Sequence, residues 1–268
     1  MFKWLSNDYS DFVSNFKDQY CKTVEQGCSI PKKVWICWWD GIDNMPVVVK
    51  TCYNSVKMNA KDFEITVVTK DNYTNYISLP QYIIDKLASG IISITHFSDI
   101  LRMSLLAKNG GLWIDATVLV TNTINLDLYK HFFTVSREGG GGNISNRRWT
   151  CNCIGGTPNY LLFLFVVNFY YDYWAKYNVI IDYHLFDYII DFAYNSVPEI
   201  KNNIDKINKN NPNYMTLQDN LGITFKDNLF NEITKDTFFH KLSWKKNHPI
   251  MNTDNELTFY VYILQKYK

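Results

Sequence analysis

The sequence lacks an excess of charge of either sign, because 27 Lys and Arg residues are balanced by 26 Asp and Glu residues. Such a chain has no broad basic face, which argues against binding of nucleic acid through its phosphates. The N-terminal stretch MFKWLSNDYSDF has no long apolar core of the kind found in signal peptides. The longest apolar run, from Tyr160, is interrupted by Asn168 and Asp172 and is too short for a membrane span. We therefore expect a cytoplasmic protein, either free or at the inner face of the cell membrane.

The sequence also lacks cysteine pairs with zinc-site spacing. It has six cysteines, none of them in a CxxC pair, and Cys151 and Cys153 are only two positions apart. Free thiols in a reducing compartment are the simpler interpretation. Aromatic and apolar residues are plentiful, at 16% and 47%, and a chain of 268 residues is long enough to bury a substantial core with them.

Hydrophobic spacing predicts an α/β fold. The segments KKVWICWW (32–39) and FEITVVTK (63–70) are typical of buried strands, and the intervening segment 46–59 has helical periodicity. This β-α-β order favours a mostly parallel central sheet flanked by helices, in a single domain. Apolar residues at helical spacing also predict an N-terminal amphipathic helix over 1–26, which either covers its own domain or contacts a membrane or partner.

The rest of the chain alternates between expected helices, strands and loops. Segment 98–111 predicts a helix with Ser98 as its N-cap, since serine there can accept a backbone N–H. Segment 110–120 predicts one strand. We further expect a strand over 131–138, a glycine-rich loop over 139–149, helices over 160–177 and 183–194, an exposed polar connection over 201–213, a short strand near Thr224 and a C-terminal helix over 255–268.

An aspartate stands in the middle of the apolar segment GGLWIDATVLV. If this segment is one strand, Trp113, Asp115 and Thr117 share one face, and Leu112 and Ile114 share the other, core-facing side. At the end of a parallel sheet, Asp115 would face the crevice where such sheets bind ligands. The carboxylate then either binds ribose hydroxyls or a cation beside a diphosphate, or pairs structurally with a basic side chain.

The run SDILRMSLLAKNGGLWIDATVLV (98–120) resembles the SDxxRxxxLxxxGGxYxDxD signature of sugar-transferring enzymes with the GT-A fold. These include glycosyltransferase family 32 and the catalytic domains of clostridial glucosylating toxins, and the chain most resembles the bacterial capsular polysaccharide synthesis family. IPKKVWICWWDG resembles that family's opening strand and FHKLSW its closing segment. The resemblance implies a single GT-A domain over 1–268, with an extension over 1–26, a nucleotide-sugar half over 30–125 and an acceptor half over 126–268.

The resemblance also implies roles for individual residues. Asp99 and Arg102 would bind the sugar hydroxyls and phosphates of the nucleotide sugar, although the pair alone is equally a common i,i+3 ion pair. Asp115, the first acid of the DxD-like motif, would contact the ribose and position a metal. The full set implied for the nucleotide sugar is Trp35, Trp38, Asp99, Arg102, Trp113, Asp115, Thr117, His240, Lys241, Ser243 and Trp244, with Asp99, Arg102 and Asp115 as its catalytic residues. Trp35 and Trp38 would approach the nucleobase, or else belong to the core.

The second acid of the DxD pattern is replaced by Thr117. A hydroxyl is a poorer ligand than a carboxylate for a hard cation. Two alternatives follow. Asp115 and His240 hold Mn²⁺ or Mg²⁺ together with the diphosphate and water, or Lys241, Arg102 and backbone amides neutralise the leaving group without a metal.

The acceptor side is implied less directly. Trp149 and Asn152 match the family's acceptor-side strand, and Asp182 or Asp187 would orient the acceptor hydroxyl unless they only cap a helix. The predicted activity is hexosyl transfer from a nucleotide sugar, with UDP as the expected nucleotide, to a glycan or lipid-linked oligosaccharide, with retention. The alternative is a degenerate, non-catalytic scaffold that binds sugars or nucleotides, as Thr117 suggests. The N-terminal helix and the aromatic, basic C-terminus are compatible with peripheral membrane contact.

Overall fold

The computed structural model describes residues 1–21, 29–127, 129–140, 142–253 and 255–268. At its centre is a five-stranded sheet of strand order β2-β1-β3-β6-β5. The parallel pairs are β1–β2 and β1–β3, whereas β6 runs antiparallel to both of its neighbours. Four of the five strands therefore point the same way, which confirms the expected mostly parallel sheet. The strands are β1 (Lys33–Cys37), β2 (Glu64–Val68), β3 (Gly111–Ile114), β5 (Phe132–Thr134) and β6 (Cys153–Gly156).

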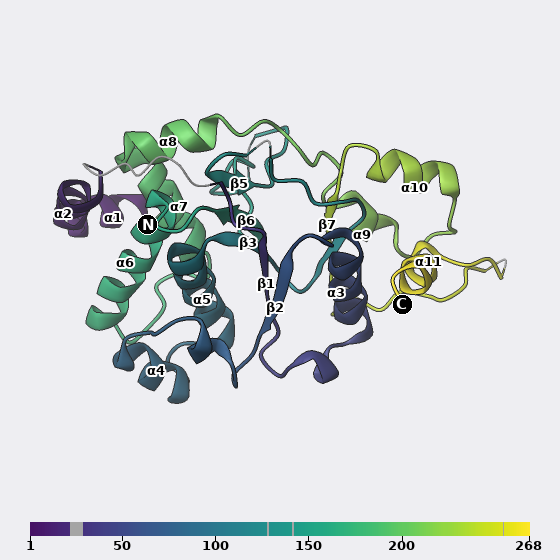
Figure 1. Ribbon diagram of the computed structural model, residues 1–268, viewed down its shortest axis with the longest axis horizontal. Coiled ribbons are helices and arrows are strands. Elements are labelled where there is room, and N and C mark those ends of the chain that lie inside the picture. Colours follow the sequence, from purple (N-terminus) through teal and green to yellow (C-terminus); the bar gives the residue numbers. More distant parts are fainter. Residues whose placement is uncertain (22–28, 128, 141, 254) are drawn as a thin grey trace.

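Helices cover both faces of this sheet (Figure 1). On one face, α5 (Ile94–Asn109) and α6 (Leu161–Lys176) share a core with Trp35 and Trp113. On the other, α3 (Val47–Asn59) shares a core with the strand residues that alternate with these two tryptophans. The central strands are buried on both sides, which explains why they read as continuous apolar runs.

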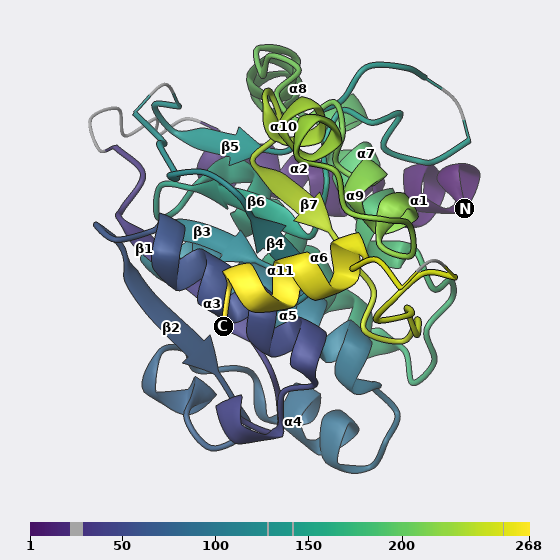
Figure 2. The same cartoon turned by 90° about the vertical axis from the view of Figure 1, so that its right-hand side faces the viewer.

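A smaller unit packs outside α3. The strand β4 (Val118–Val120) pairs antiparallel with β7 (Phe239–Lys241) in a sheet of its own. Around it, α3 forms a third apolar cluster with the helices of the C-terminal third. These helices are α9 (Thr216–Asn220), α10 (Asp227–Thr234) and α11 (Phe259–Lys266). Figure 2 shows α11 lying across α3.

The N-terminal segment packs on its own domain. Its helices α1 (Phe2–Asp8) and α2 (Ser10–Tyr20) lie against α6 and α7 (Leu185–Ser196). The Tyr9 ring stacks on Phe169 with centroids 4.2 Å apart, and the other aromatic residues of the stripe have partners of the same kind. The apolar stripe is therefore covered by protein, which is the first of the two alternatives that the sequence left open for this segment. Residues 22–26 of the expected helix lie outside the described part.

The expected strand over 110–120 is two strands. The first, β3, ends at Ile114, and the second, β4, begins at Val118 in the other sheet. The Val118 N–H donates to the Asp115 carbonyl at 2.9 Å, so residues 115–117 form a turn that carries the chain from one sheet to the next. Trp113 is also not on an open face, because it is 1% exposed in the core beneath α5. The expected division into one core face and one crevice face is therefore wrong.

Other boundaries differ from those expected. The helix that contains Ser98 begins one turn earlier, because Ser93 is its N-cap and accepts the His96 N–H at 3.3 Å. The first part of the polar connection over 201–213 belongs to the helix α8 (Pro198–Asp205). Thr224 forms only an isolated bridge to Thr258. Short elements that were not expected include α9, α10, the helix α4 (Gln81–Ala88) and the 3-10 turns η1 (Ile42–Asn44) and η2 (Tyr73–Asn75).

Within the described residues, every helix is too short or too polar to cross a membrane.

Candidate functional site

The candidate site lies at the edge where the parallel strands β1, β2 and β3 end. Asp115 directly follows β3, and its backbone N–H donates to the Asn152 carbonyl, next to β6, at 2.8 Å. The β-ladder that aligns Trp35 with Trp113 also brings Cys37, at the end of β1, close to Asp115. In open α/β sheets this edge is the usual place for a ligand.

Arg102 joins the two expected acidic residues. One of its guanidinium nitrogens lies 3.1 Å from Asp99 Oδ1 and the other 3.3 Å from Asp115 Oδ1. The guanidinium is also sandwiched between the rings of Trp113 and Phe186, whose centroids are each 5.0 Å away. Arg102 is 4% exposed, so its orientation is set by these four neighbours rather than by solvent.

Lys241 reaches the same carboxylate from the opposite end of the sequence. Its Nζ donates to Asp115 Oδ2 at 2.9 Å and to Thr117 Oγ1 at 2.7 Å. The antiparallel pairing of β4 and β7, which sets Val118 opposite Lys241, places the ammonium beside the turn. The Asp115 carboxylate is thus held by three side chains, since Trp113 Nε1 also donates to Oδ1 at 2.8 Å.

These contacts divide the acidic residues into two kinds. Burial alone would raise the pKa of Asp115, but Lys241 and Arg102 together hold it well below its usual range. Burial raises the pKa of Asp99 to about 7, against the opposing effect of Arg102 and with help from the charge of Asp115. Asp115 is therefore a permanent anion, whereas Asp99 changes its protonation near neutral pH.

A second group of residues lies beside this centre. Trp149 is buried, and its Nε1 donates to Asp187 Oδ1 at 3.0 Å. Burial raises the pKa of Asp187, and the charges of Asp187 and Asp99 act on each other. The Asn152 side chain accepts a hydrogen bond of 2.9 Å from the Tyr214 hydroxyl. Three of the four expected acceptor-side residues thus border the Arg102 centre.

The fourth residue, Asp182, has a structural role in this geometry. Its Oδ1 accepts the His184 N–H at 2.7 Å, in the turn that precedes α7, and His184 is the N-cap of that helix. The described contacts do not link Asp182 to Arg102 or Asp115.

The tryptophans fall into two groups. Trp35 is 1% exposed and donates to the Gly110 carbonyl at 2.9 Å, so it belongs to the core and does not face a nucleobase. Trp38 is half-buried and packs edge-to-face with Trp244, their centroids 5.9 Å apart. Trp244 is 43% exposed, which leaves this pair accessible from solvent.

His240 does not face Asp115. Consecutive strand residues point to opposite sides, so Lys241 points towards Asp115 and His240 points away from it. The His240 ring is fully buried, with Nε2 within 3.1 Å of Thr121 Oγ1 and 3.0 Å of the Thr237 carbonyl. Burial lowers its pKa to about 4. The expected metal pair of Asp115 and His240 is therefore not formed. The Ser243 N–H donates to Gln218 Oε1 at 2.6 Å.

The residues at this centre do not fit a divalent cation. Mn²⁺ and Mg²⁺ prefer several oxygen ligands, and carboxylates above all. Both oxygens of Asp115 already accept from cationic side chains, and Thr117 accepts from one of them. Within the described residues, no three His, Cys, Asp or Glu side chains are grouped as a metal site would require.

Two further residues border the centre but were not expected. Tyr214 supports Asn152 through its hydroxyl and accepts the Lys241 N–H with its carbonyl at 2.8 Å. Gln218 holds the backbone of Ser243. Both come from the polar region between the expected helices, where neither spacing nor composition distinguishes them from their neighbours.

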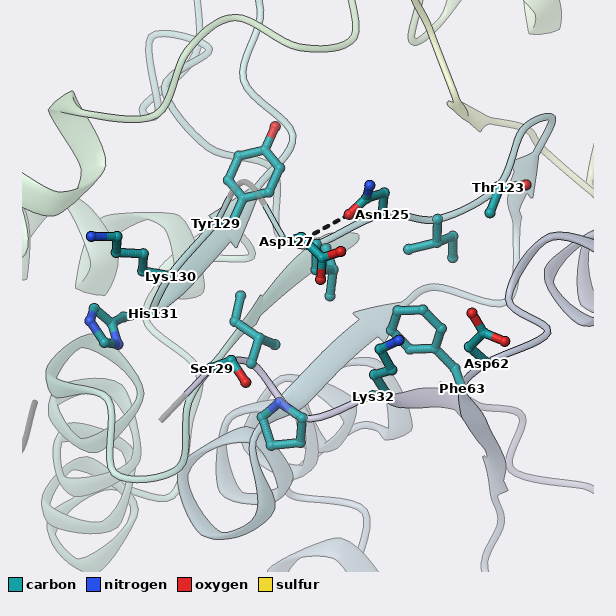
Figure 3. A pocket seen from close by; sticks show the side chains of 14 residues that line it. Ser29, Lys32, Asp62, Phe63, Thr123, Asn125, Asp127, Tyr129, Lys130 and His131 are labelled. Carbon is teal, nitrogen blue, oxygen red and sulfur yellow. Dashed lines mark hydrogen bonds between the residues drawn. The ribbon is translucent and has the colours of Figure 1, made fainter. Parts of the chain in front are cut away.

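A separate pocket of about 700 Å³ opens at the opposite edge of the sheet, where β1, β2 and β5 begin (Figure 3). The side chains labelled around it include Lys32, Asp62, Tyr129 and His131. None of the residues expected at a functional site lines it.

Comparison with protein families agrees with the resemblance seen in the sequence. The profile of the capsular polysaccharide synthesis protein family matches residues 1–263. No curated protein gives a significant sequence match. Among solved structures, the chain is similar to "PaToxG Glycosyltransferase", with 14% sequence identity, a TM-score of 0.46, and coverage of 73% of this chain and 78% of that one.

Proposed function

The chain belongs to the capsular polysaccharide synthesis protein family, and from this premise we propose that it is a glycosyltransferase that moves a hexose from a nucleotide sugar to a growing surface glycan. UDP is the proposed nucleotide. The observation that carries the proposal is the convergence of Arg102 and Lys241 on Asp115 at the carboxyl edge of the sheet. Two cations beside one fixed carboxylate suit a ligand that carries both phosphates and sugar hydroxyls.

The nucleotide sugar is proposed to lie along this edge. Its base would stack on the exposed pair of Trp38 and Trp244, since aromatic faces accept any base. The diphosphate would lie beside Lys241, and Asp115 would accept a hydroxyl of the ribose. The Arg102 side chain is too deeply buried for a ligand to contact most of it. Its main role in the proposal is to hold Asp115 and Asp99 in place.

In the proposed reaction the acceptor hydroxyl forms a bond to the anomeric carbon while the bond from that carbon to the diphosphate breaks. The hydroxyl proton passes to the departing phosphate oxygen, which is compatible with the proposed retention of configuration. The Lys241 ammonium stabilises the charge that develops on the leaving group. Asp187 and Asn152 are proposed to orient the acceptor, because they border the Arg102 centre on the side away from Trp38.

The acceptor is proposed to be a glycan or lipid-linked oligosaccharide, and the site of the reaction the cytoplasm or the inner face of the membrane. The five cysteines in the described part of the chain are free thiols, which is compatible with a reducing compartment. Peripheral membrane contact stays a proposal, and it cannot use the apolar stripe of α1 and α2, since α6 and α7 cover that stripe.

The test is release of UDP from a panel of UDP-hexoses, alone and with oligosaccharide acceptors. We expect hydrolysis or transfer with at least one sugar, and a loss of about 100-fold or more in Asp115→Asn, since a fixed charge at the reacting groups is lost. Asp62→Asn is the matched control, because Asp62 is a carboxylate at the opposite edge of the sheet. Equal rates for the wild type and Asp115→Asn would refute the proposed site.

A non-catalytic scaffold is the second candidate. It is favoured by Thr117 in place of an acid and by Lys241, which occupies the space beside Asp115. The same panel separates the two candidates. Binding of UDP-sugars without measurable turnover in the presence of acceptors would identify a scaffold, whereas turnover that depends on Asp115 identifies an enzyme.

A further inference from the structure

The Lys241 ammonium bridges the two side chains that stand at the acidic positions of the DxD-like motif. Two carboxylates at these positions would supply oxygen ligands of the kind that a divalent ion prefers. Here the Lys241 ammonium lies between the corresponding side chains, 2.9 Å from Asp115 Oδ2 and 2.7 Å from Thr117 Oγ1. The replacement of the second acid by a hydroxyl and the arrival of a lysine at the same point are complementary changes, because a monovalent cation needs only one carboxylate to balance it.

We propose that the Lys241 ammonium replaces the divalent cation, so that this protein binds the diphosphate of its nucleotide sugar without a metal. This inference rests on the proposed function, and it adds how the diphosphate is held. Lys241 then is a binding residue that contacts the ligand itself, and Thr117 is a positioning residue that acts through Lys241.

The ammonium has capacity left for a ligand. It carries three N–H donors, and the described contacts use two of them, on Asp115 and Thr117. The side chain is 24% exposed, so the third donor can reach a phosphate oxygen at this edge of the sheet. Asp115 and Thr117 fix the position of Nζ before the ligand arrives, which reduces the entropy that binding has to offset.

A divalent cation would have to displace this arrangement. Asp115 Oδ2 is engaged by Lys241, and Oδ1 accepts from Arg102 and from Trp113. A metal ion bound to the same carboxylate would lie within a few ångströms of the ammonium, where two like charges repel strongly. His240, the other expected ligand, points to the opposite side of β7. The site therefore supplies too few free oxygens and too much positive charge for Mn²⁺ or Mg²⁺.

The direct test is calorimetric titration of the full chain with UDP in buffer that contains EDTA and in buffer that contains MnCl₂. The inference predicts dissociation constants that agree within about twofold, together with equal thermal stabilisation by UDP in both buffers. Lys241→Gln should weaken UDP binding about tenfold or more in both buffers, since a charge-assisted contact is lost. Lys61→Ala is the matched control, because Lys61 is exposed and precedes β2 at the opposite edge of the sheet.

A second variant tests the inference by reversal. Thr117→Asp combined with Lys241→Ala restores two carboxylates and removes the ammonium, so UDP binding should become dependent on MnCl₂. Circular dichroism and a thermal melt establish that each variant is folded. UDP binding by the wild type that disappears in EDTA and returns with MnCl₂ would overturn the inference and leave the proposed function intact. Absence of UDP binding in both buffers would overturn the inference together with the proposed UDP-sugar specificity.

Discussion

Lys241 and Asp115 are 126 residues apart in the sequence, yet their side chains form an ion pair of 2.9 Å at the end of the central sheet. The pair exists because β7 aligns with β4 immediately after the turn that follows Asp115. It joins the N-terminal half of the chain, which carries the recognisable motif, to the C-terminal segment that closes over it.

The ion pair should also contribute to stability. In a double-mutant cycle, Asp115→Asn and Lys241→Gln should each lower the free energy of unfolding by about 1–3 kcal/mol, because each leaves a polar partner unsatisfied. The double variant should lose less than the sum, with a coupling energy of about 1 kcal/mol. Urea denaturation of the four proteins gives this value, and strict additivity would show that the contact contributes nothing.

Asp99 should make stability depend on pH. Burial raises its pKa to about 7 in the folded protein, whereas an aspartate in the unfolded chain ionises near about pH 4. Between these values the folded state holds a proton that the unfolded state has released. The stabilising contribution of Asp99 is therefore complete below the unfolded pKa and is lost as the pH rises through the folded pKa.

The measurement is the difference in unfolding free energy between the wild type and Asp99→Asn at several pH values. This difference, wild type minus variant, should fall as the pH rises from about 5 to about 8. Carbon-13 chemical shifts of the carboxyl group report the same titration directly. A difference that grows with pH would mean that Arg102 dominates over burial and that the assignment of Asp99 is wrong.

The Trp149–Asp187 hydrogen bond should respond differently to changes in its two partners. Trp149→Phe keeps most of the buried ring but removes the only N–H that Asp187 accepts in the described contacts. It should cost about 1–3 kcal/mol of stability, since a largely buried carboxylate loses its partner. Asp187→Asn keeps an acceptor oxygen and should cost less. Chemical denaturation of both variants decides this, and a neutral Trp149→Phe would contradict it.

Gly111 is needed at the start of β3 for two reasons. Its φ of +98° disfavours any side chain, and a Cβ there would lie 2.7 Å from the Lys33 carbonyl oxygen on β1. Gly111→Ala should therefore destabilise the protein by about 3 kcal/mol or more, since strain and overlap add. Gly90→Ala is the matched control. Gly90 has a φ of +76° but open space around it, so only the backbone strain of about 1–2 kcal/mol is expected. Equal losses would show that β1 can move aside.

The N-terminal helices should behave as part of the core. Phe16 is 3% exposed and packs on Phe165 at 5.0 Å, so Phe16→Ala should cost about 3–5 kcal/mol. Lys17 is the exposed neighbour of Phe16, and Lys17→Ala should change the free energy of unfolding by less than about 0.5 kcal/mol. Both variants should float with anionic liposomes to the same extent as the wild type. A selective loss of flotation in Phe16→Ala, with the free energy of unfolding unchanged, would indicate that α2 contacts the membrane.

Features that depend on neighbouring residues were predictable from the sequence. The β-α-β order of residues 32–70 predicted parallel strands, because periodicity and turn residues act over short distances. Asp99 and Arg102 were expected to lie one helical turn apart, and the structure pairs them at 3.1 Å. Asp115 was expected at the end of a strand beside a crevice, and it follows β3 at the carboxyl edge.

Errors arose where a side chain's direction depended on a partner far away in the sequence. The segment 110–120 was expected as one strand because its composition is uniform, yet the chain turns at residues 115–117 to join a second sheet. His240 and Lys241 were both expected at the nucleotide-sugar site, His240 as a metal ligand and Lys241 as a cation beside the leaving group. A strand sends neighbouring side chains to opposite faces, so only the register with β4 decides which of the two meets Asp115.

The sequence by itself thus determined the charge balance, the β-α-β order of residues 32–70, and the pairing of Asp99 with Arg102 one helical turn later. These follow from spacing within one or two turns or strands, where backbone geometry leaves few alternatives. The tertiary structure alone decided that Lys241 holds Asp115 and Thr117, that His240 and Trp35 are buried away from the site, and that the N-terminal stripe is covered. Those outcomes depend on how separate elements pack and align, and a shift of one residue in strand register would reverse them.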